Sequence, residues 1–282
     1  MHNQTKKVLI LDGYNLLYRA RYSGMNKGDY STIFNFFRSL RPLIEKFDPD
    51  KAYFVLEGRP KARLEMLPDY KGQREYHNKD NFSEQRREII ELLIEFFPLQ
   101  LVKHPDYECD DVAAHLAKEH DDGNTEITIV SSDTDFIQII SDSVKVYNPV
   151  KKDYVQGTEY DYVKWKALKG DASDNIPGFS GIGDKRAKSL VESPDKLDQF
   201  LLHEDDREKF EKNLKLIGFH NLHEDNSVED MCFIQSPVKK QWEFLKQEFE
   251  NKYNFKSMVK TEKSWNNYIN TFDKLFERLL CP

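Results

Sequence analysis

Cysteine is scarce in this sequence of 282 residues, which contains only Cys109, Cys232 and Cys281. Their odd number and wide separation fit neither a disulfide framework nor a cysteine-based zinc site, and reduced thiols in a cytoplasm explain them. The sequence also lacks a run of about 18 apolar residues, which excludes a membrane-spanning helix. The polar start, residues 1–7, has none of the features of a signal peptide. We therefore expect a soluble cytoplasmic protein without a membrane partner.

An excess of basic residues is missing as well, because the formal net charge is −7. Proteins that bind nucleic acid normally need a basic surface to contact the phosphates. Much of the negative charge comes from acidic side chains that are candidates for a metal site, and without them the remainder is slightly basic. The charge balance therefore does not exclude DNA as a partner. It argues against loose, sequence-blind coating of a polyanion.

Linkers rich in glycine, serine or proline are absent, and so are internal repeats. Short apolar runs alternate instead with helix-like stretches. The apolar runs are 7–11, 52–56, 99–102, 127–130 and 144–147, and the helix-like stretches are 31–47, 83–97, 110–120 and 134–141. Apolar strands separated by helices are typical of a parallel sheet covered on both faces. The sequence therefore predicts an α/β fold with a central, mostly parallel sheet flanked by helices.

Strand-like runs become scarce after residue 160, where helical patterns begin at 161–169 and again near 185. We expect an α/β core over residues 1–158, a helical region over 159–235 and a C-terminal helical segment over 236–282. Within the core, residues 72–82 are polar and weakly patterned, which indicates a mobile loop or a surface helix. The C-terminal segment carries no recognisable motif. It either completes the helical region or binds another protein.

Acidic side chains are concentrated where the predicted strands end and where one predicted helix begins. They are Asp12, Glu57, Asp133 and Asp135 after the strands, and Glu108, Asp110 and Asp111 at the helix start. Because the carboxyl ends of parallel strands meet at one edge of a sheet, we expect these groups to lie close together. For Asp110 or Asp135 taken alone, helix capping or an ordinary turn is the simpler explanation.

Such a cluster requires cations, because neighbouring carboxylates repel one another strongly in a crevice of low dielectric. Oxygen ligands without histidine select Mg²⁺ or Mn²⁺ over zinc. Two such ions about 4 Å apart can activate a water and stabilise the leaving oxygen of a phosphodiester. Asp171 and Asp174, three residues apart, share a face if that segment is helical and then complete a second metal position. We therefore expect metal-assisted phosphoryl transfer.

Residues 178–188 combine closely spaced glycines with the basic start of a helix. The glycines are Gly178, Gly181 and Gly183, and the cations that follow are Lys185, Arg186 and Lys188. Glycines allow tight turns and close backbone approach, and backbone N–H groups at a helix start hold a phosphate without reading bases. A plain turn between helices is the alternative for the glycines alone. The apolar Ile182 between them and the basic helix favour a helix-hairpin-helix clamp on the DNA backbone.

A second basic group lies between residues 63 and 74 and contains Arg63, Lys71 and Arg74. Cations that face a carboxylate–metal cluster bind the scissile phosphate and offset its charge in the transition state. Tyr70, in the same segment, is of a type that stacks on a terminal base. A solvated cationic face is the alternative for this segment.

Taken together, these motifs resemble the 5′-nuclease family, which includes flap endonucleases, bacteriophage 5′→3′ exonucleases and the 5′-nuclease domain of bacterial DNA polymerase I. The resemblance covers residues 7–190 in the order of the family. Its segments are LILDGYNLLYR (9–19), RLEMLPDYKGQR (63–74), YECDDVAAHLA (107–117), VSSDTDFIQII (130–140) and KGDASDNIPGFSGIGDKRAKSL (169–190). The last three segments are specific to the family, and the phage members are the nearest in length.

The resemblance implies a PIN-like nuclease core with two metal positions. Its first position would be held by Asp12, Glu57, Glu108, Asp110 and Asp133, and the second or shared positions by Asp111, Asp135, Asp171 and Asp174. Lys71 and Arg74 would lie at the base of a helical arch of residues 72–92, through which a single-stranded 5′ end passes. The hairpin 178–183 would grip duplex DNA, with a K⁺ ion held by its carbonyl groups.

The activity implied is Mg²⁺-dependent cleavage near a free 5′ end that removes RNA primers or flaps during replication, by a monomer in the cytoplasm of the cell or of a phage host. Two positions depart from the family pattern: Glu57 replaces the usual aspartate, one residue closer to Arg63 than expected, and Cys109 replaces an alanine. We expect Cys109 to be a buried small side chain. Glu57 keeps a second hypothesis open, a DNA-binding protein that no longer cleaves. A third is a PIN-type ribonuclease, which lacks the glycine hairpin.

Overall fold

The computed structural model describes residues 5–24, 28–73, 81–234 and 239–280. Its centre is a seven-stranded sheet in the order β6-β5-β4-β1-β2-β3-β9. The strands are β1 (Lys6–Asp12), β2 (Lys51–Leu56), β3 (Gln100–Lys103), β4 (Thr125–Val130), β5 (Val144–Asn148), β6 (Asp153–Tyr154) and β9 (Cys232–Ile234). The five inner strands are parallel, and β6 and β9 run antiparallel at the two edges. The prediction of a mostly parallel α/β sheet is therefore confirmed.

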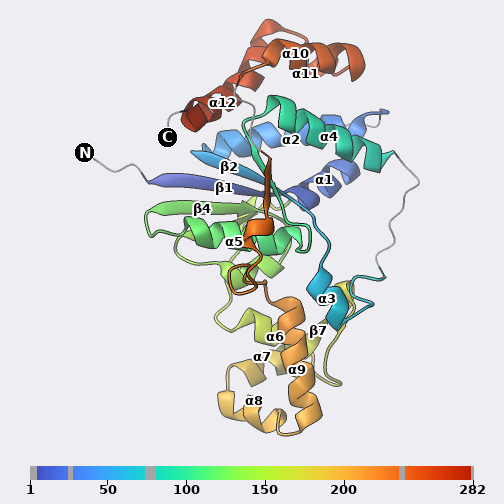
Figure 1. Ribbon diagram of the computed structural model, residues 1–282, viewed down its shortest axis with the longest axis vertical. Helices are drawn as coiled ribbons and strands as arrows, with labels where there is room; N and C mark the ends of the chain where they lie inside the picture. The colour runs from blue at the N-terminus through green and yellow to red at the C-terminus, as the bar shows by residue number, and fades with distance from the viewer. Residues whose placement is uncertain (1–4, 25–27, 74–80, 235–238, 281–282) are drawn as a thin grey trace.

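Helices cover both faces of the sheet, because successive strand residues point to opposite sides. Leu9 and Leu11 of β1 pack with α1 (Gly13–Tyr22), α2 (Ser31–Phe47) and α4 (Phe82–Phe96). Val8 and Ile10 of the same strand pack on the other face with α5 (Cys109–His120). Figure 1 shows α2 and α4 on one side of the sheet and α5 on the other.

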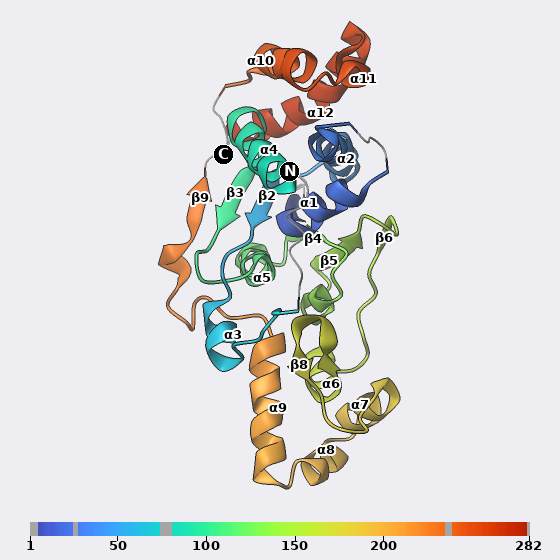
Figure 2. The same cartoon turned by 90° about the vertical axis from the view of Figure 1, so that its right-hand side faces the viewer.

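The C-terminal segment forms a further layer on the α2 and α4 side (Figures 1 and 2). It contains α10 (Trp242–Gln247), the π-helical turn η4 (Glu248–Lys252), α11 (Lys256–Val259) and α12 (Glu262–Leu280). Trp265 and Phe272 are fully buried there, and the Phe272 ring centroid lies 4.8 Å from that of Phe97. The segment is helical, as expected. It completes the core of the α/β part instead of extending the helical region.

The helical region has a small core of its own at the opposite end of the molecule (Figure 2). It contains α6 (Tyr162–Lys169), α7 (Asp184–Val191), α8 (Pro194–Phe200) and α9 (Glu204–Ile217), with the two-stranded β7 (Gly170–Asp171) and β8 (Ile176–Pro177). The expected bounds of 159–235 are too wide. After α9 the chain returns to the sheet, where Leu222 is buried and β9 pairs with β3. The sequence did not reveal β9, because this strand is only three residues long and is defined by its pairing with the distant β3.

Helices lie on either side of residues 74–80, next to and within the expected arch. α3 (Lys61–Met66) precedes it, and residues 82–92 belong to α4, where Ile89 and Leu93 are fully buried. Residues 74–80 lie outside the described residues, so the arch stays a prediction. The expected helix at 134–141 is a short 3-10 helix, η1 (Asp135–Ile139). Within the described ranges, no helix combines the length and the apolar character needed to cross a membrane.

Candidate active site

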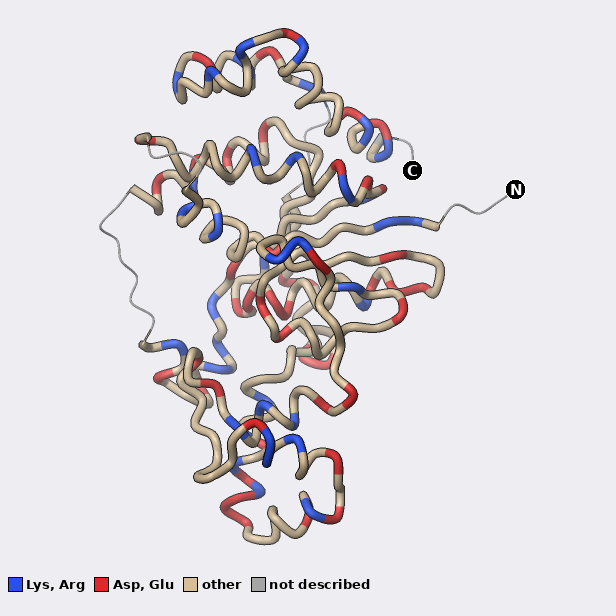
Figure 3. The backbone as a smooth tube through the Cα atoms, turned by 180° about the vertical axis from the view of Figure 1, so that it is seen from behind, with Lys and Arg blue, Asp and Glu red and all other residues tan. Residues whose placement is uncertain are grey.

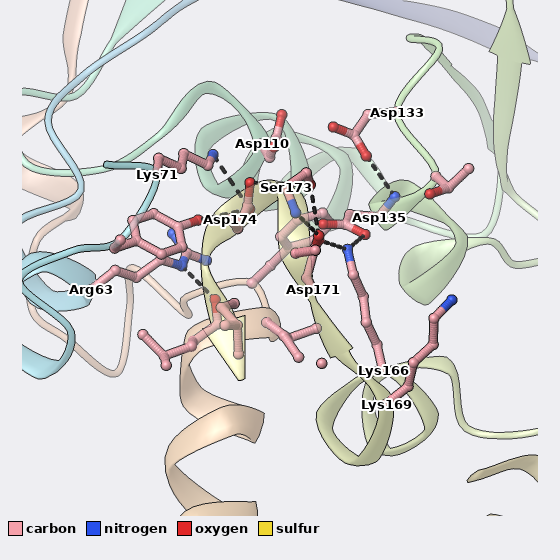
Figure 4. Close-up of a pocket in the computed structure, with 18 of the residues that line it drawn as sticks. Arg63, Lys71, Asp110, Asp133, Asp135, Lys166, Lys169, Asp171, Ser173 and Asp174 are labelled. Atoms are coloured by element: carbon pink, nitrogen blue, oxygen red, sulfur yellow. Dashed lines mark hydrogen bonds and ion pairs between the residues drawn. The ribbon is translucent and has the colours of Figure 1, made fainter. Parts of the chain in front are cut away.

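A pocket of about 410 Å³ opens at the carboxyl edge of the sheet and extends to the helical region (Figure 4). Six acidic residues line it. They are Glu108, Asp110, Asp133, Asp135, Asp171 and Asp174. They come from the start of α5, the turn after β4 and the segment around β7, so three parts of the fold converge as the sequence predicted.

Asp12 lies at the end of β1 and is 3% exposed. Its carboxylate caps α1 by accepting a hydrogen bond from the Asn15 N–H (3.0 Å), and it accepts another from the Ser131 hydroxyl (2.6 Å). Burial nevertheless raises the pKa of Asp12. Donor atoms of Asp12, Cys109 and Asp110 all lie within 4.8 Å of one another, which makes this the first acidic cluster. Cys109 is 1% exposed, which confirms the expected small buried side chain.

The charges around Asp110 and Glu57 are poorly compensated. Burial and the nearby carboxylates of Asp12 and Asp133 raise the pKa of Asp110 well above its usual value. Burial and the charge of Glu108 raise the pKa of Glu57 to about 7. The Glu57 carboxylate also accepts a hydrogen bond from the Cys109 N–H (3.1 Å), so it lies at the start of α5 beside the first cluster. Oxygen donors whose ionisation is opposed in this way fit a hard divalent cation.

Glu57 also makes folding stability depend on pH. In EDTA we expect the free energy of unfolding to fall as pH rises from about 5 to 7, by at most about 1.4 kcal/mol per pH unit. The reason is that the folded state, with a pKa of about 7 against 4.5, keeps a proton that the unfolded chain has lost. Urea unfolding of the wild type and of Glu57→Gln at pH 5, 6, 7 and 8 measures this. The raised pKa values of Asp12, Asp110 and Asp135 leave some slope in the variant. A slope between pH 5 and 7 that is equal in the wild type and Glu57→Gln contradicts the assignment.

The second acidic cluster is formed by Asp135, Asp171 and Asp174, whose donor atoms lie within 4.8 Å of one another. Asp171 ends the short strand β7, and Asp174 belongs to a 3-10 turn, so they meet without sharing an α-helical face. Burial raises the pKa of Asp135. Burial also acts on Asp171, but hydrogen bonds from Lys166 and Ser173 outweigh it and lower the pKa of that carboxyl.

Lys166 is a site residue that the sequence analysis missed. Its ammonium group lies between Asp135 and Asp171 (Figure 4), 2.6 Å from the Asp171 carboxylate and in contact with that of Asp135. Burial lowers its pKa, but the charge of Asp135 outweighs this and raises it. The one sequence signal was its place in the last turn of the helix that leads into Asp171.

Arg63 and Asp111 do not take the roles that the sequence suggested. Arg63 is 3% exposed and Asp111 is fully buried. The guanidinium group donates two hydrogen bonds to Asp111 (2.6 and 2.8 Å), one to Glu108 (2.9 Å) and others to the carbonyls of Leu216 and Gly218. All of these groups are internal, so Arg63 cannot contact DNA from this position. Asp111 is likewise committed to Arg63 and is not a metal ligand.

Asp111 caps the start of α5, a role that the sequence analysis did not assign to it. Its carboxylate accepts a hydrogen bond from the Glu108 N–H (3.2 Å), and together with Glu108 it forms a capping box at the start of α5. It also accepts one from the His220 N–H (2.9 Å). Although burial raises its pKa, the charge of Arg63 outweighs this and lowers it. Arg63 and Asp111 therefore tie α3, α5 and the end of α9 together.

Tyr70 and Lys71 belong to the site in different ways. Tyr70 is 5% exposed, and its hydroxyl donates to Glu108 (3.0 Å) and Asp174 (3.3 Å), so its ring is not available to stack on a base. The Lys71 ammonium group contacts Glu108 and lies 3.8 Å from Asp174. Lys71 is thus a cation at the pocket wall, where its expected phosphate role stays a prediction. Arg74 lies outside the described residues.

The glycine hairpin has the backbone that the sequence predicted at two of its three glycines. A Cβ atom on Gly178 would lie 1.9 Å from the Lys169 carbonyl oxygen, and Gly181 has a φ of +71°. Gly183 precedes α7 with a φ of −98°, which any residue adopts. The three following cations, Lys185, Arg186 and Lys188, are exposed on α7. The geometry therefore allows a backbone clamp, which stays a prediction.

Comparison with known proteins agrees with this arrangement. Residues 7–167 match the family model of the N-terminal resolvase-like domain of 5′-3′ exonucleases, and residues 158–224 match that of the C-terminal SAM fold of the same enzymes. The chain belongs to the 5′-3′ exonuclease family. The resemblance seen in the motifs is thereby confirmed, in preference to the alternative of a PIN-type ribonuclease.

Curated members of the 5′-3′ exonuclease family are about a third identical to this chain over the residues that align. Thermostable DNA polymerase I of Thermus aquaticus is 32% identical over 211 residues, which is 69% of this chain but 25% of the polymerase. A 5′-3′ exonuclease of Aquifex aeolicus is 31% identical over 204 residues, which is 66% of this chain and 69% of that protein. The chain thus spans about a quarter of the polymerases it matches.

Solved structures share the fold at lower identity. A flap endonuclease of bacteriophage T5, in a pseudo-enzyme–product complex with DNA and metal ions, gives a TM-score of 0.65 at 20% identity and covers 96% of this chain and 100% of that one. The T5 5′-exonuclease with bound zinc gives 0.64 at 23% identity, covering 75% and 89%. The catalytic core of Rad2 with a DNA substrate gives 0.56 at 13% identity, covering 96% and 93%.

Proposed function

We propose that this member of the 5′-3′ exonuclease family is an active, Mg²⁺-dependent nuclease that cleaves near the free 5′ end of flapped, nicked or primed duplex DNA, and removes flaps or RNA primers in replication. One observation carries the proposal: six carboxylates from three parts of the fold line a single pocket together with Lys71 and Lys166. The relatives add support, since they include a flap endonuclease with DNA and metal ions.

The residues divide into two metal positions. Asp12, Glu57, Glu108, Asp110 and Asp133 would hold the first ion, and Asp135, Asp171 and Asp174 the second. Bound Mg²⁺ supplies Lewis acidity and an activated water for phosphodiester hydrolysis, and Mn²⁺ can substitute. Lys71 and Lys166 bring positive charge to the pocket, where they orient the scissile phosphate and balance its charge. The Tyr70 hydroxyl fixes Glu108 and Asp174 relative to each other.

Duplex DNA would bind along the hairpin 178–183 and the start of α7. Backbone N–H groups there, with K⁺ held by hairpin carbonyls, grip the phosphates without reading sequence. Figure 3 shows acidic and basic residues interspersed along the described backbone, which fits DNA binding through a few specific phosphate contacts.

Replication proteins could bind the C-terminal segment, and we propose that the protein acts as a monomer in the cytoplasm.

Cleavage of a 5′-labelled flap duplex tests the proposal directly. With Mg²⁺ we expect 5′-phosphorylated products cut near the junction, and no products with EDTA. A blunt duplex of the same sequence and a flap with a blocked 5′ end serve as controls. Binding without cutting, in both Mg²⁺ and Mn²⁺, contradicts the proposal and favours a DNA-binding protein that no longer cleaves.

Lys185→Glu tests the clamp. We expect weaker duplex binding, and a slope of log affinity against log salt that is smaller by about one for each phosphate that the variant no longer neutralises. Fluorescence anisotropy across a salt series measures both. Lys263→Glu, the same charge change on an exposed lysine of α12 at the far end of the molecule, is the matched control. Equal salt slopes for the two variants contradict the clamp.

A further inference from the structure

A second group of side chains with metal-binding chemistry lies away from the carboxylate pocket. His115 and Glu119 are four residues apart on α5 and therefore share a face of that helix. His223 comes from the turn that follows α9. One donor atom of each lies within 4.8 Å of the other two, and none of the three residues lines the carboxylate pocket.

The three side chains already lie close enough together to bind one ion. The Nε2 atom of His223 lies 2.6 Å from a carboxylate oxygen of Glu119, and the ring centroids of His223 and His115 are 4.9 Å apart. His115 is 4% exposed, and its Nε2 atom has no hydrogen-bond partner among the residues that the structure describes. A buried polar atom without a partner costs free energy, which a bound ligand would recover.

The turn that carries His223 is held in place from several sides. Leu222, its neighbour, is fully buried, and the Leu222 carbonyl accepts a hydrogen bond from the Ser227 N–H (2.9 Å). The His223 carbonyl accepts another from the Asn226 N–H (3.2 Å). Because the backbone on both sides is fixed, little conformational entropy is lost when His223 takes up a ligand.

The donor set selects a different ion from the one expected in the carboxylate pocket. Two imidazoles and one carboxylate suit Zn²⁺, whereas Mg²⁺ prefers oxygen donors alone. The side chains of Glu119 and His223 are 48% and 50% exposed, so a water can complete a four-coordinate site. We propose that His115, Glu119 and His223 form a zinc site that joins α5 to the turn after α9. The proposal does not depend on the nuclease function.

Zinc titration of the full chain in saturating Mg²⁺, in competition with a chromophoric chelator, tests this site. We expect His223→Ala to bind one zinc fewer than the wild type, and Glu119→Gln to bind it at least about tenfold more weakly. His203→Ala, which removes an exposed histidine before α9, is the matched control and should behave like the wild type. Zinc should also raise the melting temperature of the wild type and the control, and not that of His223→Ala.

The variants are chosen at the two exposed ligands, so that folding is not at risk. Cobalt provides a second measurement, since a tetrahedral site with imidazole ligands gives visible absorption bands that His223→Ala should lose. Equal zinc stoichiometry and affinity in the wild type and His223→Ala overturn the proposal, because the zinc is then held elsewhere. Absence of zinc binding at micromolar concentration also overturns it and leaves Glu119 and His223 as an ordinary ion pair.

Discussion

Replacing Asp133 with asparagine is expected to reduce cleavage of a flap substrate by about a thousandfold or more, while duplex affinity changes only a few-fold. The change removes a carboxylate from the pocket wall, where it faces Asp110, and metal ions in such sites supply several kcal/mol of transition-state stabilisation. The fold should persist, since an asparagine oxygen can still accept the Asp135 N–H that now bonds to Asp133 (2.8 Å).

Single-turnover cleavage and anisotropy on the same flap duplex measure the two effects separately. Asp142→Asn is the matched control, because Asp142 is an exposed aspartate a few residues along the same segment. It should cleave like the wild type. If Asp133→Asn cleaves as well as the wild type, Asp133 is not a metal ligand. If the variant fails to bind DNA, Asp133 acts in DNA binding instead.

Replacing Arg63 with alanine is expected to lower the free energy of unfolding by about 3–5 kcal/mol, because it leaves buried carboxylates without their partner. Asp111 is fully buried and Glu108 is 3% exposed, so water cannot solvate either carboxylate in place of the guanidinium group. Arg63→Lys should recover only part of the stability, because an ammonium group cannot make the paired hydrogen bonds of the guanidinium group.

Urea unfolding distinguishes this role from direct DNA contact. Arg59→Ala, on an exposed arginine of the same segment, is the control and should change stability by less than about 0.5 kcal/mol. If Arg63 instead contacts DNA, Arg63→Ala will bind duplex more weakly and keep its stability. The two outcomes exclude each other, and both can be measured on one preparation.

The acidic residues at strand ends could be predicted from the sequence because their placement follows from one rule of parallel sheets. Asp12 and Asp133 follow buried strands whose carboxyl ends meet at one edge, and Asp110 opens the helix beside them. This prediction did not require knowing which distant side chains contact one another. The same rule located Glu57, which lies beside the cluster in spite of its unusual side chain.

The roles that were misjudged depend on contacts between distant segments. Arg63 looked like a surface cation because its partners are Asp111 and the Leu216 carbonyl, which lies 153 residues away along the chain. Tyr70 looked available for stacking on a base for the same reason, since its hydroxyl donates a hydrogen bond to the carboxylate of Glu108, which is distant in sequence. Lys166 was overlooked because no local feature distinguishes it from Lys164 and Lys169 on the same short helix.

The placement of β9 restricts how the two ends of the molecule can move. The chain leaves the sheet after β6 at one edge, builds α6 to α9, and returns through β9 at the opposite edge. A region joined at one side can swing as on a single hinge, whereas one joined at both edges of the sheet is restrained at two points. The wall that carries Asp171 and Asp174 is therefore restrained relative to the wall that carries Asp110, which limits how far the two walls can separate when substrate enters.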